Sequence, residues 1–331
     1  MNILYIGHGI THMGNWPDSR EWDERHIVKG FRANGHHTVY VFSPDHRPNE
    51  PFDLVVWNKR VRPTMIQRTD LMRIKRRYKC PQVYWHCDGF HITPAMPRPN
   101  EGWFWKVARD FDMVLLPEGT MLPRYEAAAR TRFRYMQYAC DLDYCPPSAE
   151  PVDPWRCDVG FIGKRQSGVA RGHIYGNRNR LLDTLAGGFD LGVWSISPRE
   201  WKAAGIDARD PVCGVDFARA CRSAKILIGA SQKSWCWGGW STRAVNVMAC
   251  GGFLLHENTP GFADFFQPGV HCDVFRPDDA NDAAERIRYW LGHPDDRERV
   301  ARQGQAHVRA NHNWQVRTAE VLALMRKEKL L

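Results

Sequence analysis

The chain has 331 residues, of which 43% are hydrophobic and 25% are charged. This composition is typical of a globular protein, and the length suits two domains of about 150 residues. The apolar runs are far shorter than the roughly 20 residues of a membrane helix, and residues 1–7 indicate a first strand and not a signal peptide. The sequence therefore predicts no membrane span and a cytoplasmic location.

Ten cysteines are scattered along the chain without a CxxC pair, a pattern that favours reduced thiols over a disulfide framework. His86, Cys87 and Asp88 are adjacent, but adjacent residues on a strand point to opposite faces and rarely bind one ion together. We therefore expect no metal site.

The net charge of +9 is concentrated in residues 59–79, which hold nine basic side chains and one acid, Asp70. One interpretation is a solvated helix face. The other is a surface that binds a polyanion such as duplex DNA. The candidate residues for such a surface are Arg73, Lys75, Arg76 and Arg77.

In the first half, short apolar runs alternate with polar stretches of helical length. The predicted strands are 2–6, 38–42, 53–57, 82–86 and 113–116, and the predicted helices are 19–34, 63–78 and 102–110. This alternation predicts βαβ units and a parallel sheet.

The proline-rich segment 146–156 is a candidate linker, and a second alternating series follows it. Its predicted strands are 157–162, 190–194, 225–228 and 253–256. Its predicted helices are 179–185, 215–221, 241–249, 261–266, 280–291, 297–311 and 314–329.

The expected fold class is α/β, with two Rossmann-like, doubly wound parallel-sheet domains that face each other across a cleft. The predicted boundaries are 1–148 for an N-terminal domain, 149–156 for the linker, and 157–312 for a C-terminal domain. A closing helix within 313–331 could pack back on the first domain.

A glycine-rich loop precedes the predicted helix 241–249. Gly238 and Gly239 lead into Ser241 and Thr242, where backbone N–H groups and small hydroxyls suit phosphate oxygens. Arg243 could add a bidentate charge. The alternative is that Ser241 is an N-cap and Arg243 a surface residue.

Residues 237–330 carry several spaced elements in a recognisable order. Ser241, Arg243, Ala249, Cys250 and Gly251 fit the signature Ser-x-Arg-x-x-Glu-x-x-Ala-Cys-Gly, and closing helices with a His-Pro pair at 293–294 follow it. The sequence here resembles the CgeB-like (spore-maturation-protein-like) glycosyltransferases, a GT-B family. The resemblance extends over 156–322 and is weaker in the N-terminal half.

This resemblance implies a C-terminal domain that binds a nucleotide-diphosphate sugar and an N-terminal domain that binds the acceptor. Asn246 stands where the family has a glutamate expected to hold the donor ribose, and asparagine is a neutral, weaker acceptor. Gly239, Ser241, Thr242, Arg243 and Asn246 are therefore predicted donor-binding residues.

A second predicted donor-binding element is Gly163, Lys164 and Arg165, at the end of strand 157–162. Without a bound metal, such cations would neutralise the leaving diphosphate; the alternative is solvated loop charges. The basic stretch 171–180 could cover the same site. We expect no cofactor beyond the donor and no obligatory metal.

The candidate general base is Asp88 at the end of strand 82–86, or His8 or His12 after the first strand. His86 and His91 are rivals. An inverting enzyme needs such a base, whereas a retaining one does not.

The sequence thus predicts an enzyme, a hexosyltransferase-like glycosyltransferase. The leading acceptor is a hydroxylated base in phage-type DNA, and the alternatives are a glycan, a protein or a small molecule. A nucleotide-sugar epimerase or a non-catalytic nucleotide- or nucleic-acid-binding relative stays open. A dinucleotide dehydrogenase is disfavoured because Gly7 and Gly9 lack a third glycine at the required spacing; Gly14 comes too late.

Overall fold

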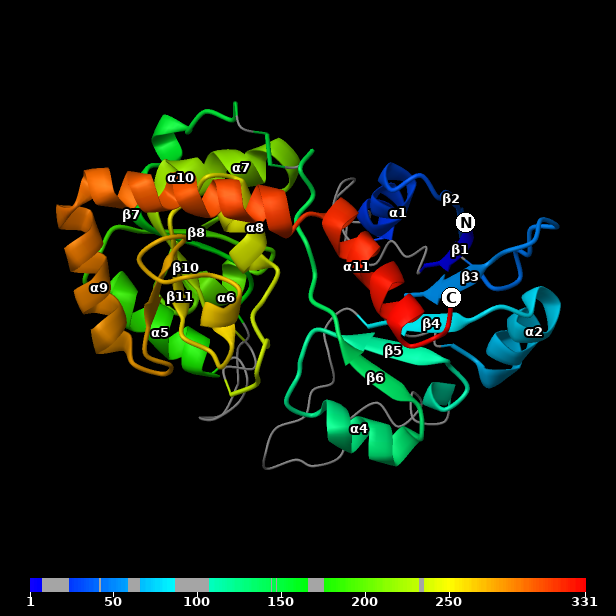
Figure 1. The fold of residues 1–331 in the computed structure, drawn as a ribbon. Coiled ribbons are helices and arrows are strands. Elements are labelled where there is room, and N and C mark those ends of the chain that lie inside the picture. Colours follow the sequence, from blue (N-terminus) through cyan, green and yellow to red (C-terminus); the bar gives the residue numbers. More distant parts are fainter. Residues whose placement is uncertain are drawn as a thin grey trace. The chain divides into compact units, whose positions relative to one another are not determined.

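The computed structural model describes residues 1–7, 24–41, 43–58, 66–86, 107–143, 145–146, 148–165, 176–231 and 235–331. The chain forms two compact units (Figure 1). The N-terminal unit is Met1–Tyr138 with Trp314–Leu331, and the C-terminal unit is Ala139–Asn313. Each unit contains one six-stranded sheet.

All strand pairs in the N-terminal sheet are parallel, in the order β2-β1-β3-β4-β5-β6. Every residue of β3, β4 and β5 is buried, as expected for parallel strands that helices cover on both faces. The strands are β1 (Asn2–Ile6), β2 (His37–Val41), β3 (Leu54–Trp57), β4 (Gln82–Trp85), β5 (Met113–Leu116) and β6 (Arg132–Tyr135).

The helices of this unit include α11, which comes from the end of the chain and packs against α1. Their axes approach closely at Gly30, where a Cβ atom would lie 2.4 Å from the Trp314 carbonyl oxygen. Trp314 also contacts the Trp85 ring, with the two ring centroids 5.9 Å apart. The helices are α1 (Glu24–Ala33), α2 (Arg68–Tyr78), α4 (Leu122–Ala129) and α11 (Trp314–Lys327).

The C-terminal sheet is also parallel, in the order β12-β11-β10-β7-β8-β9. The strand order reverses between the neighbours β7 and β10, and ligands of open α/β sheets bind outside the carboxyl ends of strands at such a point. The strands are β7 (Cys157–Ile162), β8 (Leu191–Trp194), β9 (Ala208–Arg209), β10 (Ala224–Gly229), β11 (Leu254–Glu257) and β12 (Asp273–Phe275).

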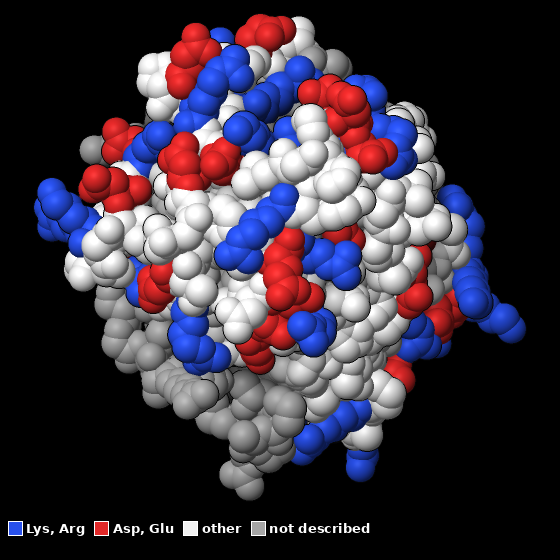
Figure 2. All heavy atoms as spheres, turned by 90° about the vertical axis from the view of Figure 1, so that its left-hand side faces the viewer, with Lys and Arg blue, Asp and Glu red and all other residues white. Residues whose placement is uncertain are grey.

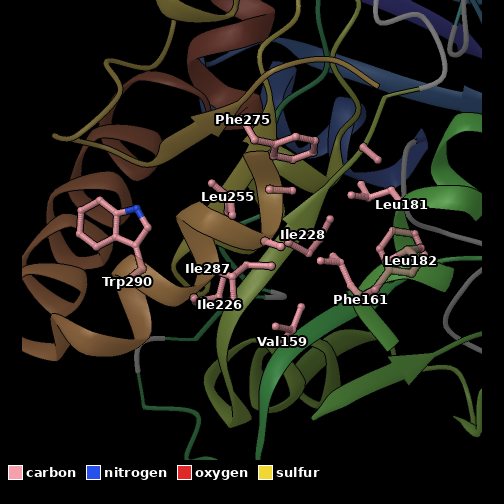
Figure 3. Packing of buried hydrophobic residues seen from close by; sticks show 14 of the residues in the cluster. Val159, Phe161, Leu181, Leu182, Ile226, Ile228, Leu255, Phe275, Ile287 and Trp290 are labelled. Atoms are coloured by element: carbon pink, nitrogen blue, oxygen red, sulfur yellow. The ribbon is translucent and has the colours of Figure 1, made fainter. Parts of the chain in front are cut away.

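One apolar core lies between this sheet and helices α5 and α9 (Figure 3). Leu181 and Leu182 of α5 and Ile287 of α9 meet Ile226 and Ile228 of β10 there. The helices are α5 (Gly176–Ala186), α6 (Pro198–Lys202), α7 (Gly214–Ser223), α8 (Arg243–Ala249), α9 (Ala280–Gly292) and α10 (Pro294–Asn311), with 3-10 turns at Asp153–Trp155 and Phe262–Asp264.

The expected fold class is confirmed: two parallel, doubly wound sheets are present. The predicted strands all occur, with their ends shifted by at most one residue. Segment 261–266, predicted as a helix, is only a short 3-10 turn. The sequence did not predict α4, β6, α6, β9 or β12.

Charges of both signs lie interspersed on the face of the molecule drawn in Figure 2, with no single broad basic patch on that face. None of the helices in the described part of the chain is long and apolar enough to cross a membrane. The cysteines in that part carry free thiols.

Candidate active site in the C-terminal unit

The carboxyl ends of β7 and β10 are joined by one side chain, Arg243, the first residue of α8. Its Nε donates to the Ile162 carbonyl at 2.7 Å, and its Nη1 donates to the Ala230 carbonyl at 3.3 Å. The guanidinium also lies 4.7 Å from the centroid of the Phe161 ring, a cation–π distance. Arg243 is therefore held in place where the strand order reverses.

Position 163 requires a glycine, because the guanidinium of Arg243 leaves no room there for a side chain. A Cβ atom on Gly163 would lie 2.7 Å from Nη2 of Arg243. The glycine thus lets the chain after β7 pass directly against the guanidinium.

A second arginine reaches the same loop from α5. Arg178 is buried, donates from Nη2 to the Lys164 carbonyl at 2.8 Å, and lies 5.7 Å from the Phe161 ring centroid. Two guanidinium groups therefore surround the loop 162–164. A pair of fixed cations at the carboxyl edge of a parallel sheet is suited to oxyanions such as a diphosphate.

The two cations predicted within this loop differ in their surroundings. Lys164 is exposed. Arg165 forms a two-pronged ion pair with Asp183, with N–O distances of 2.6 and 2.8 Å, and lies 5.2 Å from the Trp201 ring centroid. Asp183 therefore neutralises Arg165, whereas Lys164 lies at an exposed position of the loop.

The glycine-rich loop before α8 is closed by its own backbone. Gly238 and Gly239 donate their N–H groups to the carbonyls of Pro260 and Cys236, both at 3.0 Å.

Among the described residues, the buried Oγ of Ser241 has no hydrogen-bond partner. Thr242 is the N-cap of α8 but its side chain makes no capping bond, and Asn246 is half-buried one turn further on. Hydroxyls, and not glycine N–H groups, are thus the available donors in this loop.

Next to this arginine pair, β11 ends in a buried carboxyl group, Glu257. Its two oxygens accept from the backbone N–H groups of Ser231 and Asp278, both at 3.3 Å. Burial raises the pKa of Glu257 to about 7, although those two bonds lower it. A carboxyl group with such a pKa exchanges a proton near neutral pH.

His256, the preceding residue, is fully buried and stacks on Phe262 with centroids 4.3 Å apart. Its Nδ1 lies 2.6 Å from the Glu257 carbonyl oxygen, and its Nε2 lies 3.3 Å from Ser231 Oγ. A carbonyl oxygen only accepts, so Nδ1 carries the proton and Nε2 accepts from Ser231. Burial lowers the pKa of His256 to about 4, which keeps the ring neutral.

A cavity of about 150 Å³ opens beside these residues, between α5 and the start of α9. Arg178, Arg180 and Glu257 supply its charged lining together with Asp278 and Asp279, and Ala230 comes from the end of β10. The sequence analysis missed Arg178 and Glu257 as individual residues. Arg178 lies in the basic stretch 171–180, and Glu257 follows a strand as Asp88 does, so both carried a detectable signal.

The predicted catalytic residues Asp88, His8 and His12 lie outside the described residues, as does His91. His86 is described: it is buried just after β4. The described residues contain no group of three or more histidine, cysteine, aspartate or glutamate side chains that could hold a metal ion.

The four basic residues predicted for a polyanion surface all lie on α2. Arg73 pairs with Asp45 and Asp70, and Lys75 pairs with Asp112 at 3.1 Å. Within the described part of the chain, Arg76 and Arg77 bind carbonyl oxygens of the backbone or of an amide and no carboxylate. Half of the predicted charge is therefore neutralised within the unit itself.

Comparison with solved structures identifies the fold as GT-B. Sucrose-phosphate synthase (tll1590) from Thermosynechococcus elongatus shares 12% identity at a TM-score of 0.61, over 98% of both chains. Anabaena Alr3699/HepE, in complex with UDP and glucose, shares 12% identity at a TM-score of 0.60, over 99% of this chain and 100% of that one. A protein titled trehalose-6-phosphate from E. coli, bound with UDP-2-fluoro glucose, shares 8% identity at a TM-score of 0.66, over 98% of both chains. The class of fold that the chain shares with these structures is thus GT-B.

The family comparison is more specific. The glycosyl transferase-like family matches residues 165–323 of the chain. A comparison with curated proteins gives no match.

Proposed function

We propose that the protein transfers a sugar from a nucleotide-diphosphate sugar to an acceptor hydroxyl, and that the C-terminal unit binds the donor. The observation that carries this proposal is the position of Arg243 across the ends of β7 and β10, with Arg178 on the same loop. Structural neighbours in complex with UDP and glucose or with UDP-glucose support this donor class.

In this proposal the diphosphate lies against Arg243, Arg178 and Lys164. Positive charge held in a fixed position stabilises the nucleotide diphosphate as it leaves, without solvent rearrangement. Ser241 Oγ, buried without a partner among the described residues, donates to a phosphate oxygen. Arg165, already paired with Asp183, orders the loop.

The remaining predicted residues complete the site. Asn246 accepts from a ribose hydroxyl in place of the glutamate of CgeB-like enzymes, a subfamily assignment that is part of this proposal. Asp88, His8 or His12 removes the proton from the acceptor if the enzyme inverts the sugar carbon. No metal is required, because the arginines and Lys164 supply the countercharge.

The test is a thermal-unfolding screen with UDP, other nucleoside diphosphates and their sugars. A ligand at 100 times its Kd stabilises the folded state by about 2.7 kcal/mol, which raises the melting temperature measurably. Arg243→Gln is expected to abolish the shift. Arg219→Gln is the matched control, because Arg219 is an exposed arginine of the same unit that pairs with Asp216. No shift with any nucleotide would contradict the proposal.

Turnover assays separate the alternatives that share this site. Slow hydrolysis of a stabilising nucleotide sugar without acceptor supports an enzyme over a non-catalytic relative. An epimerised sugar formed from the donor alone would indicate a nucleotide-sugar epimerase.

For the acceptor, a hydroxylated base of duplex DNA stays our leading candidate, beside a glycan, a protein or a small molecule. The observation in its favour is that Arg76 and Arg77 of α2 have no carboxylate partner within the described residues. The pairing of Arg73 and Lys75 with aspartates weakens it.

A further inference from the structure

A second polar cavity lies at the opposite edge of the C-terminal sheet from the donor site. Cys157 and Ala224, the first residues of β7 and β10, form its floor together with Phe253. Because the strands are parallel, their amino ends lie a full strand length from the Arg243 site. The cavity is about 510 Å³, within the size range of small-molecule sites.

The charged lining of this cavity is mainly basic. Among the described residues that line it, Glu298 is the one carboxylate, and the cations are Arg156, Arg222, Lys225, Arg297 and Arg302. The three exposed cations have carboxylate partners: Arg156 with Asp153, Lys225 with Asp158, and Arg302 with Glu298. These three ion pairs form the rim of the cavity, where positive and negative charges alternate.

The two inner arginines differ from the rim. Arg222 and Arg297 are half-buried, and neither forms an ion pair with a carboxylate in the described part of the chain. Nε of Arg222 donates to the Cys250 carbonyl at 3.0 Å, and Nη1 of Arg297 donates to the Trp290 carbonyl. These bonds fix both guanidiniums at helix ends.

The bonds to the helix ends do not use all the hydrogen-bond donors of Arg222 and Arg297. A guanidinium has five N–H donors, and each of these bonds uses one of them. Burial lowers the pKa of Arg297, and the negative charges of Glu298 and Asp158 offset this effect only in part. Two fixed, under-neutralised cations in one cavity favour an anion with several oxygens.

We propose that this cavity binds a phosphate-bearing small molecule, with Arg222 and Arg297 as its principal partners. A phosphate group accepts from both guanidiniums at once, which a single carboxylate does less well. The carboxylates of the rim disfavour a continuous polyanion such as DNA. The site is separate from the donor site and does not depend on the proposed function.

The experiment is calorimetric titration of inorganic pyrophosphate into the full chain carrying Arg243→Gln, which removes the donor-site cation. Pyrophosphate is expected to bind this variant, and Arg222→Gln or Arg297→Gln added to it is expected to weaken binding by about tenfold or more. Loss of pyrophosphate binding in Arg243→Gln alone would overturn the proposal.

Because Arg222→Gln and Arg297→Gln change half-buried residues and could disturb folding, a second test uses a charge reversal on the surface of α10. Arg302→Glu lies on the rim and is expected to weaken binding about threefold or more. Arg299→Glu is the matched control: it is an exposed arginine of the same helix that does not line the cavity. Equal affinities of these two variants would also overturn the proposal. Titration of a hexose phosphate and of a nucleoside monophosphate then distinguishes the two sources of the phosphate group.

Discussion

At the scale of single residues, the proposed donor site depends on side chains whose partners come from distant parts of the sequence. Arg243 is separated by 81 residues from Ile162 and by 13 from Ala230, yet it binds both carbonyls. Glu257 is 26 residues from Ser231, whose N–H group it accepts. The chemistry of each residue is visible in the sequence, but its environment is not.

Glu257 gives a prediction about pH. Its pKa is raised from 4.5 to about 7 in the folded protein, so between these pH values the folded state binds more protons than the unfolded state. Folding stability from this group is therefore present at low pH and lost as the pH rises through this window. Between pH 4.5 and 7, the free energy of unfolding of the wild type should fall by about 3 kcal/mol more than that of Glu257→Gln.

Urea unfolding at a series of pH values measures this difference. Glu285→Gln, at an exposed position on α9, is the control and should follow the wild type. Parallel pH curves for the wild type and Glu257→Gln would show that the carboxyl group is not buried as described.

At the scale of elements, the contact between α1 and α11 depends on the absence of a side chain at Gly30. A methyl group there would lie 2.4 Å from the Trp314 carbonyl oxygen and 3.0 Å from the Thr318 methyl group. Gly30→Ala should therefore destabilise the N-terminal unit by about 1–3 kcal/mol, despite the better helix propensity of alanine.

Gly292→Ala is a matched control at the end of α9, because nothing lies within 4 Å of its added Cβ. Thermal unfolding followed by circular dichroism should show a lower midpoint for Gly30→Ala and an unchanged or higher one for Gly292→Ala. Equal midpoints for the two variants would contradict the close packing of these helices.

The strands that the sequence did not predict share a physical property. β6, β9 and β12 each form an edge of their sheet. β9 and β12 have two and three residues, and β6 alternates arginine with aromatic residues. An edge strand has one neighbour and one exposed side, so it needs no continuous apolar run. The central strands are mostly apolar and buried, and the sequence predicted them.

At the scale of the whole molecule, the net charge of +9 gives a prediction for DNA binding. If α2 contacts DNA phosphates, Arg76→Gln with Arg77→Gln should reduce the slope of log Kd against log salt by about 2. Arg73→Gln with Lys75→Gln should reduce it less, because Asp45, Asp70 and Asp112 already neutralise those cations.

Fluorescence anisotropy with a duplex of modified bases measures these slopes. Arg219→Gln with Arg299→Gln removes the same charge from exposed sites in the other unit and is the control. An equal change in all three double variants would mean that DNA responds to net charge alone, and it would remove α2 as the DNA-binding element.

The sequence by itself determined the class of fold and the central strands, and it predicted which residue types stand in the proposed donor loop. These follow from local signals: apolar runs, glycine breaks, and cations placed where strands end. Only the tertiary structure decided which cations are neutralised, as Arg165 is by Asp183, and which are held by carbonyls, as Arg243 and Arg178 are. The reason is that the pKa and the availability of a side chain depend on burial and on partners that folding brings from distant parts of the chain.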